Sequence, residues 1–456
     1  MMQDNERVMH LHRMKKMAAL EIKEYALRLQ KMIQCKTVSV KESYDDIEFA
    51  KLRDVMVELF PLVHEKATKM TFSDDCWIYC IEGKDPTRNL MLMSHHDVVA
   101  VEGEWKYDGF SGEIAEDKIW GRGTVDTKTP LFAEFSALEE LLAEGYEPPC
   151  NVYIGSSHNE ELAGDGIPNA LEYFKEKGIT FEVVLDEGGA VIDPPVGGMK
   201  VEKCAMVAVH EKGFYHLNCK AMTGSAHAGL TAGQKATPVE RMSAFIHEIS
   251  SKNIFIRRLN PQITAMFTHM APHCKFPMNI VFGNLWLFGG ILKKIMPSLS
   301  PAAGGLLGTT CVFNRIEGSA ETKECIARAT LRPVDSLDWE IDLQNFIEVA
   351  KKYDITVEVD EKSEYHEPAD MTKPQLSYTF DCIKKVFPEY PPIPMILPAG
   401  TDARHLTEIC PCILRFAPIR LSAQQLASVH SENENIDVDA VVLAVDFYKE
   451  FLREYK

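Results

Sequence analysis

The chain has 456 residues, of which 46% are hydrophobic and 25% charged, a composition typical of globular proteins and not of disordered ones. This length is too great for one ordinary domain and predicts two or three, each able to bury a core. The formal net charge of −18 argues against nucleic acid or an anionic membrane as a partner, because both bind basic surfaces.

Twelve cysteines are scattered without the paired spacing of a zinc knuckle, which predicts reduced, mostly buried thiols. Cys410-Pro-Cys412 lacks the two-residue gap of a redox motif. The first thirty residues are charged throughout and hold no apolar core of a secretory signal. No stretch reaches the roughly 18 uninterrupted apolar residues of a transmembrane helix. We therefore expect a cytoplasmic protein without a transmembrane segment.

The first elements predicted in chain order are two amphipathic helices, residues 18–34 and 51–60, and a strand over residues 75–81. In the first helix, apolar side chains recur at helical spacing, which indicates packing on a sheet. The next strand contains Leu90 to Met93, and its lack of polar alternation suits a strand buried on both faces of a parallel sheet.

This strand delivers His95, His96 and Asp97 at its carboxyl end. Ligand sites in open α/β sheets lie beyond the carboxyl ends of the strands. A His with a carboxylate two residues later can bind a metal through one ring nitrogen while the carboxylate orients the ring. The triplet alone is weak evidence, because such pairs are more often simply hydrogen-bonded at a surface.

Two later apolar runs end in the same way. Residues 151–155 lead to Glu160 and Glu161, and residues 181–185 run directly into Asp186. Three predicted strands therefore place acids or imidazoles at one edge of the sheet.

Between these strands lies a glycine-bearing turn that carries the isolated acid Asp126, followed by a helix predicted to end at Gly145. Strand, turn, helix and strand form the crossover unit of a parallel α/β layer. Buried carboxylates in such numbers repel one another and take up protons unless a positive charge lies among them. A pair of divalent cations is the simplest such charge.

After Asp186 the pattern changes to that of an antiparallel sheet. Residues 210–220 alternate polar and apolar side chains, and Thr237-Pro-Val-Glu240 is a capping box that predicts a helix to about residue 249. Strands at 326–331 and 355–359 around a helix at 343–353 complete a four-stranded sheet with two helices. We interpret 209–360 as an inserted α+β domain, and 1–208 with 361–456 as an α/β domain whose mostly parallel sheet is flanked by helices.

The segment from Phe276 to Leu292 carries no charge and includes Trp286 and Phe288. The first interpretation is an apolar strand and loop, buried in the inserted domain or at a subunit contact. The alternative is an exposed apolar patch that receives a fatty or aromatic substrate group or touches a membrane surface.

The C-terminal part supplies a cation and one more imidazole. Arg404 follows the turn Gly400-Thr401, and the planar fork of Arg grips a carboxylate through two hydrogen bonds. His430 follows a polar loop and precedes a helix predicted over residues 437–452.

Six short motifs together resemble the co-catalytic zinc hydrolases, the family of aminoacylase, carboxypeptidase S, carnosinase and the succinyl-diaminopimelate desuccinylases. They occur in the order of that family and at roughly its separations, from about Glu24 to the C-terminus. The motifs are His95-His-Asp97, Gly121-Arg-Gly-Thr-Val-Asp126-Thr-Lys, Asn159-Glu-Glu161, Asp186-Glu-Gly-Gly189, Gly400-Thr-Asp-Ala-Arg404 and His430-Ser-Glu-Asn-Glu434.

The resemblance implies two Zn²⁺ ions per chain, with Co²⁺ or Mn²⁺ as substitutes. The implied ligands are Asp126 as a bridge, His95 with Asp186 at one metal, and Glu161 with His430 at the other. Whether Asp186 or its neighbour Glu187 is the ligand stays open.

The resemblance also implies the catalytic and substrate-binding residues. Glu160 would be the general base for the attacking water, and Asp97 would orient His95. His227, in the inserted lid and dimerisation domain, would reach the site of the other subunit in a homodimer and stabilise the oxyanion. Arg404 and Thr401 would bind the substrate.

We therefore expect a zinc-dependent hydrolase that cleaves a dipeptide or an N-acyl amino acid with a free carboxylate. Three departures from the family pattern leave the substrate open: Asn159 replaces the usual Asp, Thr129 replaces the usual Gly, and an Asn-Val-Ile-Pro element is missing near residues 321–325. The alternative is a catalytically silent metal-binding dimer with a binding function. The presence of both Glu160 and Asp97 argues against that alternative.

Overall fold

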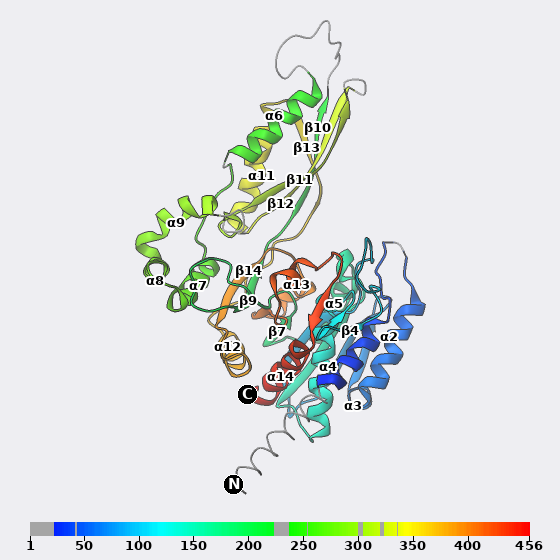
Figure 1. Cartoon of the computed structure of the whole chain (residues 1–456). Helices are drawn as coiled ribbons and strands as arrows, with labels where there is room; N and C mark the ends of the chain where they lie inside the picture. Colours follow the sequence, from blue (N-terminus) through cyan, green and yellow to red (C-terminus); the bar gives the residue numbers. More distant parts are fainter. Residues whose placement is uncertain are drawn as a thin grey trace.

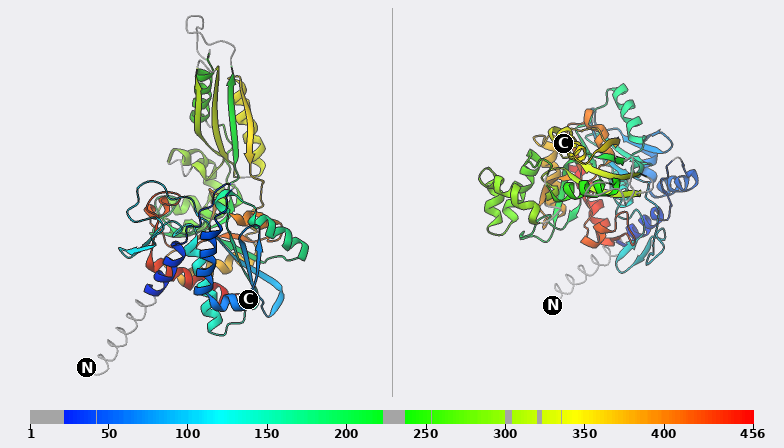
Figure 2. Two further views of the ribbon diagram at one scale, coloured as in Figure 1. Left: turned by 90° about the vertical axis from the view of Figure 1, so that its right-hand side faces the viewer. Right: turned by 90° about the horizontal axis from the view of Figure 1, so that it is seen from above.

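The computed structural model describes residues 22–41, 43–222, 237–252, 254–299, 304–319, 323–334 and 336–456. His227 therefore lies outside the described residues. A broad part contains both ends of the described chain, and an elongated part stands on it with a sheet and helices of its own (Figures 1 and 2). No helix among the described residues is both long and apolar enough to cross a membrane.

A mixed sheet of nine strands forms the centre of the broad part. Its strands are β1 (Thr68–Phe72), β2 (Cys76–Ile81), β3 (Asp85–His95), β6 (Cys150–Ser157), β7 (Val183–Asp186), β8 (Val191–Ile192), β9 (Cys204–Glu211), β14 (Pro392–Leu397) and β15 (Ile413–Arg415). They run in the order β1-β2-β6-β3-β7-β15-β9-β14, with β8 beside β9. The central strands β6, β3, β7 and β15 are parallel, whereas β1 and β2 add an antiparallel edge. The predicted parallel layer is therefore confirmed at the centre of the sheet.

Alternate side chains of β3 enter the cores on the two faces of the sheet, as the uninterrupted apolar run predicted. Leu90 and Leu92 join one core, and Met91 and Met93 the other. The first core is covered by the helix described over residues 22–33, α2 (Asp46–Leu59), α3 (Pro61–Lys66), α4 (Lys128–Ala143), α12 (Pro374–Val386) and α14 (Val438–Glu454). The second is covered by α5 (Gly166–Lys177) and η3 (Asp402–Glu408).

A small antiparallel sheet brings the C-terminal loop beside the turn at Asp126. It consists of β4 (Glu113–Ala115), β5 (Lys118–Trp120) and β16 (Asn435–Asp437), in the order β16-β5-β4. Directly before β16, the carbonyl of Glu434 accepts a hydrogen bond from the N–H of Gly121 at 2.9 Å. The short helix α13 (Ala423–Ala427) leads into this loop. Pairing of β16 with β5 thus joins segments that are some 300 residues apart in sequence.

The elongated part contains a four-stranded antiparallel sheet in the order β11-β12-β10-β13, covered on one face by two helices. Its elements are β10 (Tyr215–Met222), α6 (Pro238–Ser251), β11 (Thr310–Ser319), β12 (Glu324–Arg332), α11 (Ser336–Lys351) and β13 (Ile355–Lys362). The rings of Phe245 and Phe346 join the two helices edge to face at 5.2 Å. The capping box of Thr237 and Glu240 is present at the start of α6.

The apolar segment predicted as strand and loop is helical instead. Most of it lies in α8 (Met278–Gly283) and α9 (Leu285–Leu299), which follow α7 (Pro261–Met270) and η2 (Ala271–His273). Leu292 and Met296, four residues apart, pack with Met266 and Phe282 in a core against β9 and β14. The strand prediction was wrong because an uncharged run with almost no polar residues has no visible period, so contacts with the sheet decided between helix and strand.

Candidate metal centre

Three neighbouring parallel strands deliver the acids and imidazoles of one cluster. His95 is the last residue of β3, and Glu160 and Glu161 begin the short helix η1 (Glu160–Leu162) after β6. Glu187 follows β7 directly. Because β6, β3 and β7 are adjacent, these side chains lie at one edge of the sheet, as predicted.

Asp126 lies between two imidazoles and contacts each with a different carboxylate oxygen. Its Oδ1 is 2.9 Å from Nε2 of His95, and its Oδ2 is 3.0 Å from Nε2 of His430. The same nitrogen of His430 is 3.0 Å from Oε2 of Glu161. Ligand atoms of His95, Asp126 and Glu161 lie within 4.8 Å of one another, and so do those of His95, Glu160 and Glu187.

The cluster has an excess of negative charge. Burial opposes a charge on His95, yet its contacts with Asp126 and Asp97 raise its pKa well above the usual range. Hydrogen bonds that His430 donates to Asp126 and Glu161 raise its pKa to about 10. Among the described residues, Oε1 of Glu161 is buried without a hydrogen-bond partner. A carboxylate between two imidazoles, together with an unpartnered buried carboxylate oxygen, fits a pair of divalent cations.

Of the two adjacent acids after Leu185, Glu187 faces the cluster. Its Oε1 is 4.0 Å from Nε2 of His95. Asp186 accepts backbone hydrogen bonds with both oxygens, from Glu187 at 2.9 Å and from Ala403 at 3.0 Å. Glu187 therefore lies at the cluster, whereas Asp186 ties β7 to η3.

Asp97 contacts the parts of the site that follow β3 and β6. Its Oδ1 is 3.3 Å from Nδ1 of His95, which matches the predicted orienting role. Its two oxygens also accept hydrogen bonds from the backbone N–H groups of Glu160 and Glu161, each at 3.2 Å. One buried carboxylate thus sets the position of an imidazole on β3 and of the two acids after β6.

Glu434 is a supporting residue that the sequence analysis did not assign. Its buried Oε1 accepts hydrogen bonds from the N–H groups of Gly123, Val125 and Asp126 at 3.1, 2.7 and 3.2 Å. Its Oε2 is 2.6 Å from Nη1 of Arg122. The only signal in the sequence was an acid at the end of the motif that begins with His430.

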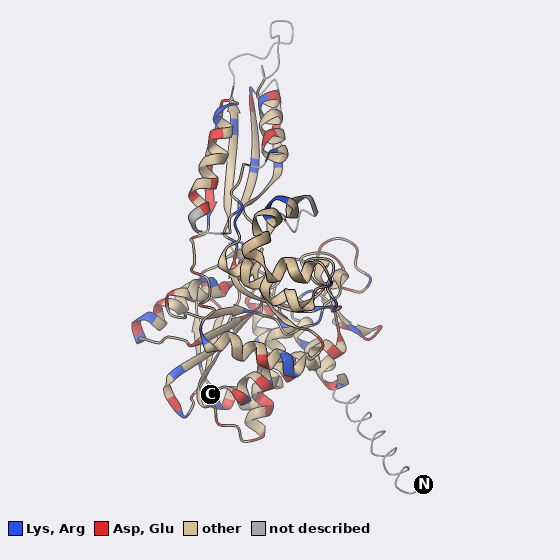
Figure 3. Ribbon diagram, turned by 90° about the vertical axis from the view of Figure 1, so that its left-hand side faces the viewer, with Lys and Arg blue, Asp and Glu red and all other residues tan. Residues whose placement is uncertain are grey.

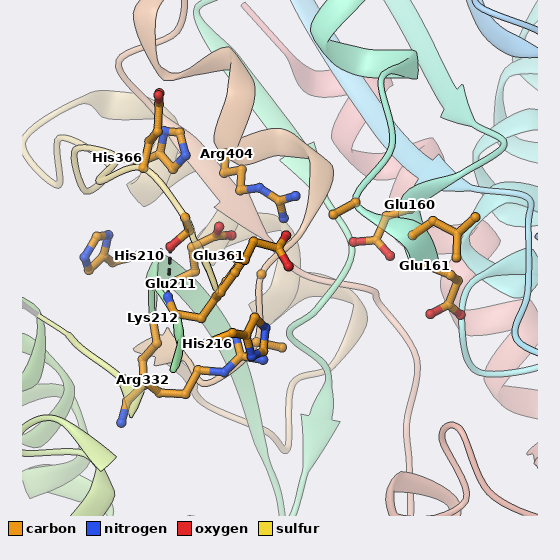
Figure 4. A pocket seen from close by; sticks show the side chains of 18 of the residues that line it. Glu160, Glu161, His210, Glu211, Lys212, His216, Arg332, Glu361, His366 and Arg404 are labelled. Carbon is orange, nitrogen blue, oxygen red and sulfur yellow. Dashed lines mark hydrogen bonds between the residues drawn. The ribbon is translucent and has the colours of Figure 1, made fainter. Parts of the chain in front are cut away.

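A polar pocket of about 410 Å³ lies beside the cluster, between the broad part and the foot of the four-stranded sheet. Figure 4 shows the side chain of Arg404 between His366 and the pair Glu160–Glu161. Lys212 and Arg332 add positive charge to its wall. The pocket therefore joins the predicted carboxylate-binding Arg to the predicted general base.

Thr401 supports this pocket from below its surface. Thr401 is buried, and its N–H donates to Oε2 of Glu211 at 3.1 Å. Nε of Arg415 donates to the Thr401 hydroxyl at 3.1 Å, and the same nitrogen is 2.8 Å from the carboxylate of Glu211. The carbonyl of Thr401 accepts from Nη1 of Arg404 at 3.1 Å. Thr401 thus positions Arg404 within the turn.

A second cavity, of about 480 Å³, opens from the other side of the cluster and is apolar. Asp126, Glu160, Glu161, Glu187 and His430 form its polar end. Its remaining wall comes from β8, β9, β14, α7 and the segment after β15, with Ile192, Met206, Met266, Leu397 and Ile419 among its side chains. The acidic cluster thus lies where a polar and an apolar pocket meet.

Comparison with known proteins places the chain among hydrolases. The model of peptidase family M20/M25/M40 matches residues 91–454. Probable carboxypeptidase S-like 2 of Dictyostelium discoideum is 29% identical over 451 residues, covering 94% of this chain and 85% of that protein. The N-fatty-acyl-amino acid synthase/hydrolase PM20D1 of Xenopus tropicalis is 27% identical over 456 residues, covering 96% and 87%. Human carnosine dipeptidase 1 shares the fold with a TM-score of 0.66 at 16% identity, over 97% of this chain and 99% of that one.

Proposed function

Because this chain belongs to peptidase family M20/M25/M40, we propose that it is a two-zinc hydrolase that cleaves the amide bond of N-acyl amino acids with a free carboxylate. The observation that carries the proposal is the position of Asp126, within 3.0 Å of both His95 and His430. The cluster lies at the junction of a polar pocket, whose lining includes Arg404, Lys212 and Arg332, and an apolar cavity. An N-acyl amino acid has a carboxylate at one end, which suits the polar pocket, and an apolar acyl chain at the other, which suits the apolar cavity.

The residues that would hold the metals are His95 and Glu187 at one position, Glu161 and His430 at the other, and Asp126 between them. This set of imidazole and carboxylate ligands suits Zn²⁺, and Co²⁺ or Mn²⁺ can take such sites. When bound there, a pair of such ions supplies a Lewis acid for the scissile carbonyl and lowers the pKa of the attacking water.

Glu160 supplies the proton transfer in this proposal. Its backbone is held by Asp97, and its side chain lines both the polar pocket and the apolar cavity. A carboxylate at that junction accepts a proton from the attacking water and passes it to the nitrogen of the leaving amino acid. The amide C–N bond breaks as that nitrogen is protonated. Glu160 thus returns to the leaving amine the proton that it took from water, and it ends the reaction ionised again.

The two pockets support one orientation of the substrate. Arg404 lies in the polar pocket, where its guanidinium would bind the carboxylate of the amino-acid product. The acyl group would then enter the apolar cavity, where side chains such as Ile192, Met206 and Met266 suit a hydrocarbon chain. The name of the Xenopus relative, a hydrolase of N-fatty-acyl amino acids, agrees with this choice.

The test is a substrate panel assayed with zinc, cobalt or manganese, in the wild type and in Glu160→Gln. We expect N-acyl amino acids of increasing chain length to be cleaved faster than dipeptides, and acyl amino-acid amides to be poor substrates. Glu160→Gln should retain its metals and lose about 10² to 10⁴ of the rate. Equal rates in the two proteins would remove Glu160 from the mechanism. A wild type that binds metal but cleaves no member of the panel would favour the silent binding protein.

We keep the homodimer as part of the proposal, with His227 acting in the site of the other subunit. Glu160→Gln and His227→Ala proteins would each be inactive alone. After subunit exchange, mixed dimers contain one site with both residues intact, so activity should return. Continued inactivity despite demonstrated exchange would exclude the arrangement in trans.

A further inference from the structure

The helices α8 and α9 expose an apolar surface at the outer edge of the molecule (Figures 1 and 2). Trp286 is 84% exposed and Phe276 is 79% exposed. Leu287, Ile291 and Ile295 are also exposed, and they recur every four residues along α9. A helix that buries one face at residues 292 and 296 thus presents a second apolar face to solvent.

The sequence that contains this surface has a positive net charge, whereas the chain as a whole has a negative one. Between Glu248 and Glu317 the sequence contains no Asp or Glu and has seven Lys or Arg residues, although the whole chain carries a net charge of −18. Lys275 precedes Phe276, and Lys293 and Lys294 lie beside Ile295. Figure 3 views this side of the molecule, and the helices formed by residues 261–299 are tan and blue there without red.

We propose that the surface formed by Phe276, Ile280, Trp286, Leu287, Ile291 and Ile295, with its three lysines, docks on an anionic lipid bilayer. Helices with one apolar face and flanking lysines lie in the plane of the interface, with the apolar side chains among the acyl chains and the lysines at anionic headgroups. The exposed Trp286 suits this position, because its ring prefers the boundary between apolar and polar layers. The net charge of the whole chain argued against an anionic membrane as a partner. At this surface the local positive charge counts instead, because salt screens charges that lie more than about 10 Å from the headgroups.

A second copy of the chain fits this surface less well than a bilayer does. An isologous contact pairs each patch with itself. Two copies would place Lys275, Lys293 and Lys294 of each protomer near those of the other, with no acid between Glu248 and Glu317 to neutralise them. Like charges brought together at an interface oppose association.

The docking is independent of the hydrolase activity proposed above, although the two are compatible. Met266 of α7 lines the apolar cavity and belongs to the same core as Leu292 and Met296 of α9. A bilayer on the outer face of α9 would therefore lie on the same side of the molecule as α7, which forms part of the cavity wall. The experiment below measures binding alone, so it stands whatever the enzyme cleaves.

The experiment is co-sedimentation of the full chain with vesicles of phosphatidylcholine alone, or of phosphatidylcholine with phosphatidylserine, over a series of salt concentrations. The test variants are Phe276→Ser with Trp286→Ser, and Lys293→Glu with Lys294→Glu. The control is Ile47→Ser on α2, where the replaced side chain is 79% exposed, as Phe276 is. Thermal unfolding of each variant verifies that it is folded.

We expect the wild type and Ile47→Ser to bind vesicles with phosphatidylserine, and salt to weaken that binding. The charge variant should bind at least 25-fold more weakly, because each lysine near an anionic surface contributes about fivefold. The apolar variant should bind at least 100-fold more weakly, because each aromatic side chain taken out of water contributes about tenfold or more. The proposal would be overturned if the wild type bound neither kind of vesicle, or if all four proteins bound equally. So would self-association without lipid that the apolar variant abolishes in sedimentation equilibrium, since the surface would then be a contact between copies.

Discussion

Replacing Glu434 by Gln should loosen the turn that presents Asp126. The buried carboxylate accepts three backbone N–H groups of that turn with Oε1 and binds Arg122 with Oε2. The carbonyl of Gln can keep the three N–H bonds. Its NH₂ group, however, would face Nη1 of Arg122, which is itself buried and now lacks its partner anion.

The cost follows from that lost ion pair. Removing one partner of a buried pair costs about 3 to 5 kcal/mol. Two features place this case near 3 kcal/mol at the low end. Burial raises the pKa of Glu434, so part of the lost attraction is offset by a smaller desolvation cost. Nη2 of Arg122 also keeps its 3.0 Å hydrogen bond to the carbonyl of Ser431.

Two measurements test this prediction in the same preparation. Urea unfolding of chelator-treated protein should show the loss of about 3 kcal/mol. Competition with a chromogenic chelator should show metal affinity reduced about 10- to 100-fold, the range for residues that position ligands. The control is Glu432→Gln, an exposed acid in the same loop, which should change neither quantity. A Glu434→Gln protein with wild-type stability and metal affinity would refute the reasoning.

Three further outcomes follow from the site. Glu187→Ala should lower the metal content from two ions per chain toward one, while Asp186→Asn should keep two; the opposite result, by elemental analysis, would return the ligand role to Asp186. Arg404→Lys should lower kcat/KM about 10- to 100-fold for substrates with a free carboxylate, the range for a lost charged hydrogen bond, and leave amidated substrates unchanged; equal losses for both would exclude a clamp. Chelation should abolish activity and added zinc should restore it, so chelated protein that stays fully active would exclude a metal mechanism.

Much of the site could be predicted from local patterns. The apolar run of β3 has the length and composition of a strand buried on both faces, so His95 had to lie at its carboxyl end. The order of strand, turn and helix around Asp126 required a parallel crossover, which places neighbouring strand ends at one edge. The capping box at Thr237 marks the start of α6 because its two hydrogen bonds involve residues only three apart.

The choice between Asp186 and Glu187 was different in kind. Two successive residues point to opposite sides of an extended chain, so local sequence allows either acid to be the ligand. The decision came from η3, more than 200 residues later, where the N–H of Ala403 binds Asp186. The role of Glu434 has the same origin, because its partner N–H groups lie more than 300 residues earlier.

The helices α8 and α9 show why apolar segments are hardest to interpret from sequence. Periodicity reveals a helix or strand only when polar and apolar side chains alternate, and this segment has almost no polar residues. The surface that β9 and β14 present to the segment decides which of its apolar faces is buried. The other apolar face remains exposed to solvent. Local sequence thus determined the elements and the chemistry at their ends, because both depend on near neighbours. Tertiary contacts decided which of two adjacent acids faces the cluster of His95 and Asp126 and which apolar face meets solvent, because the groups responsible lie far away in the chain.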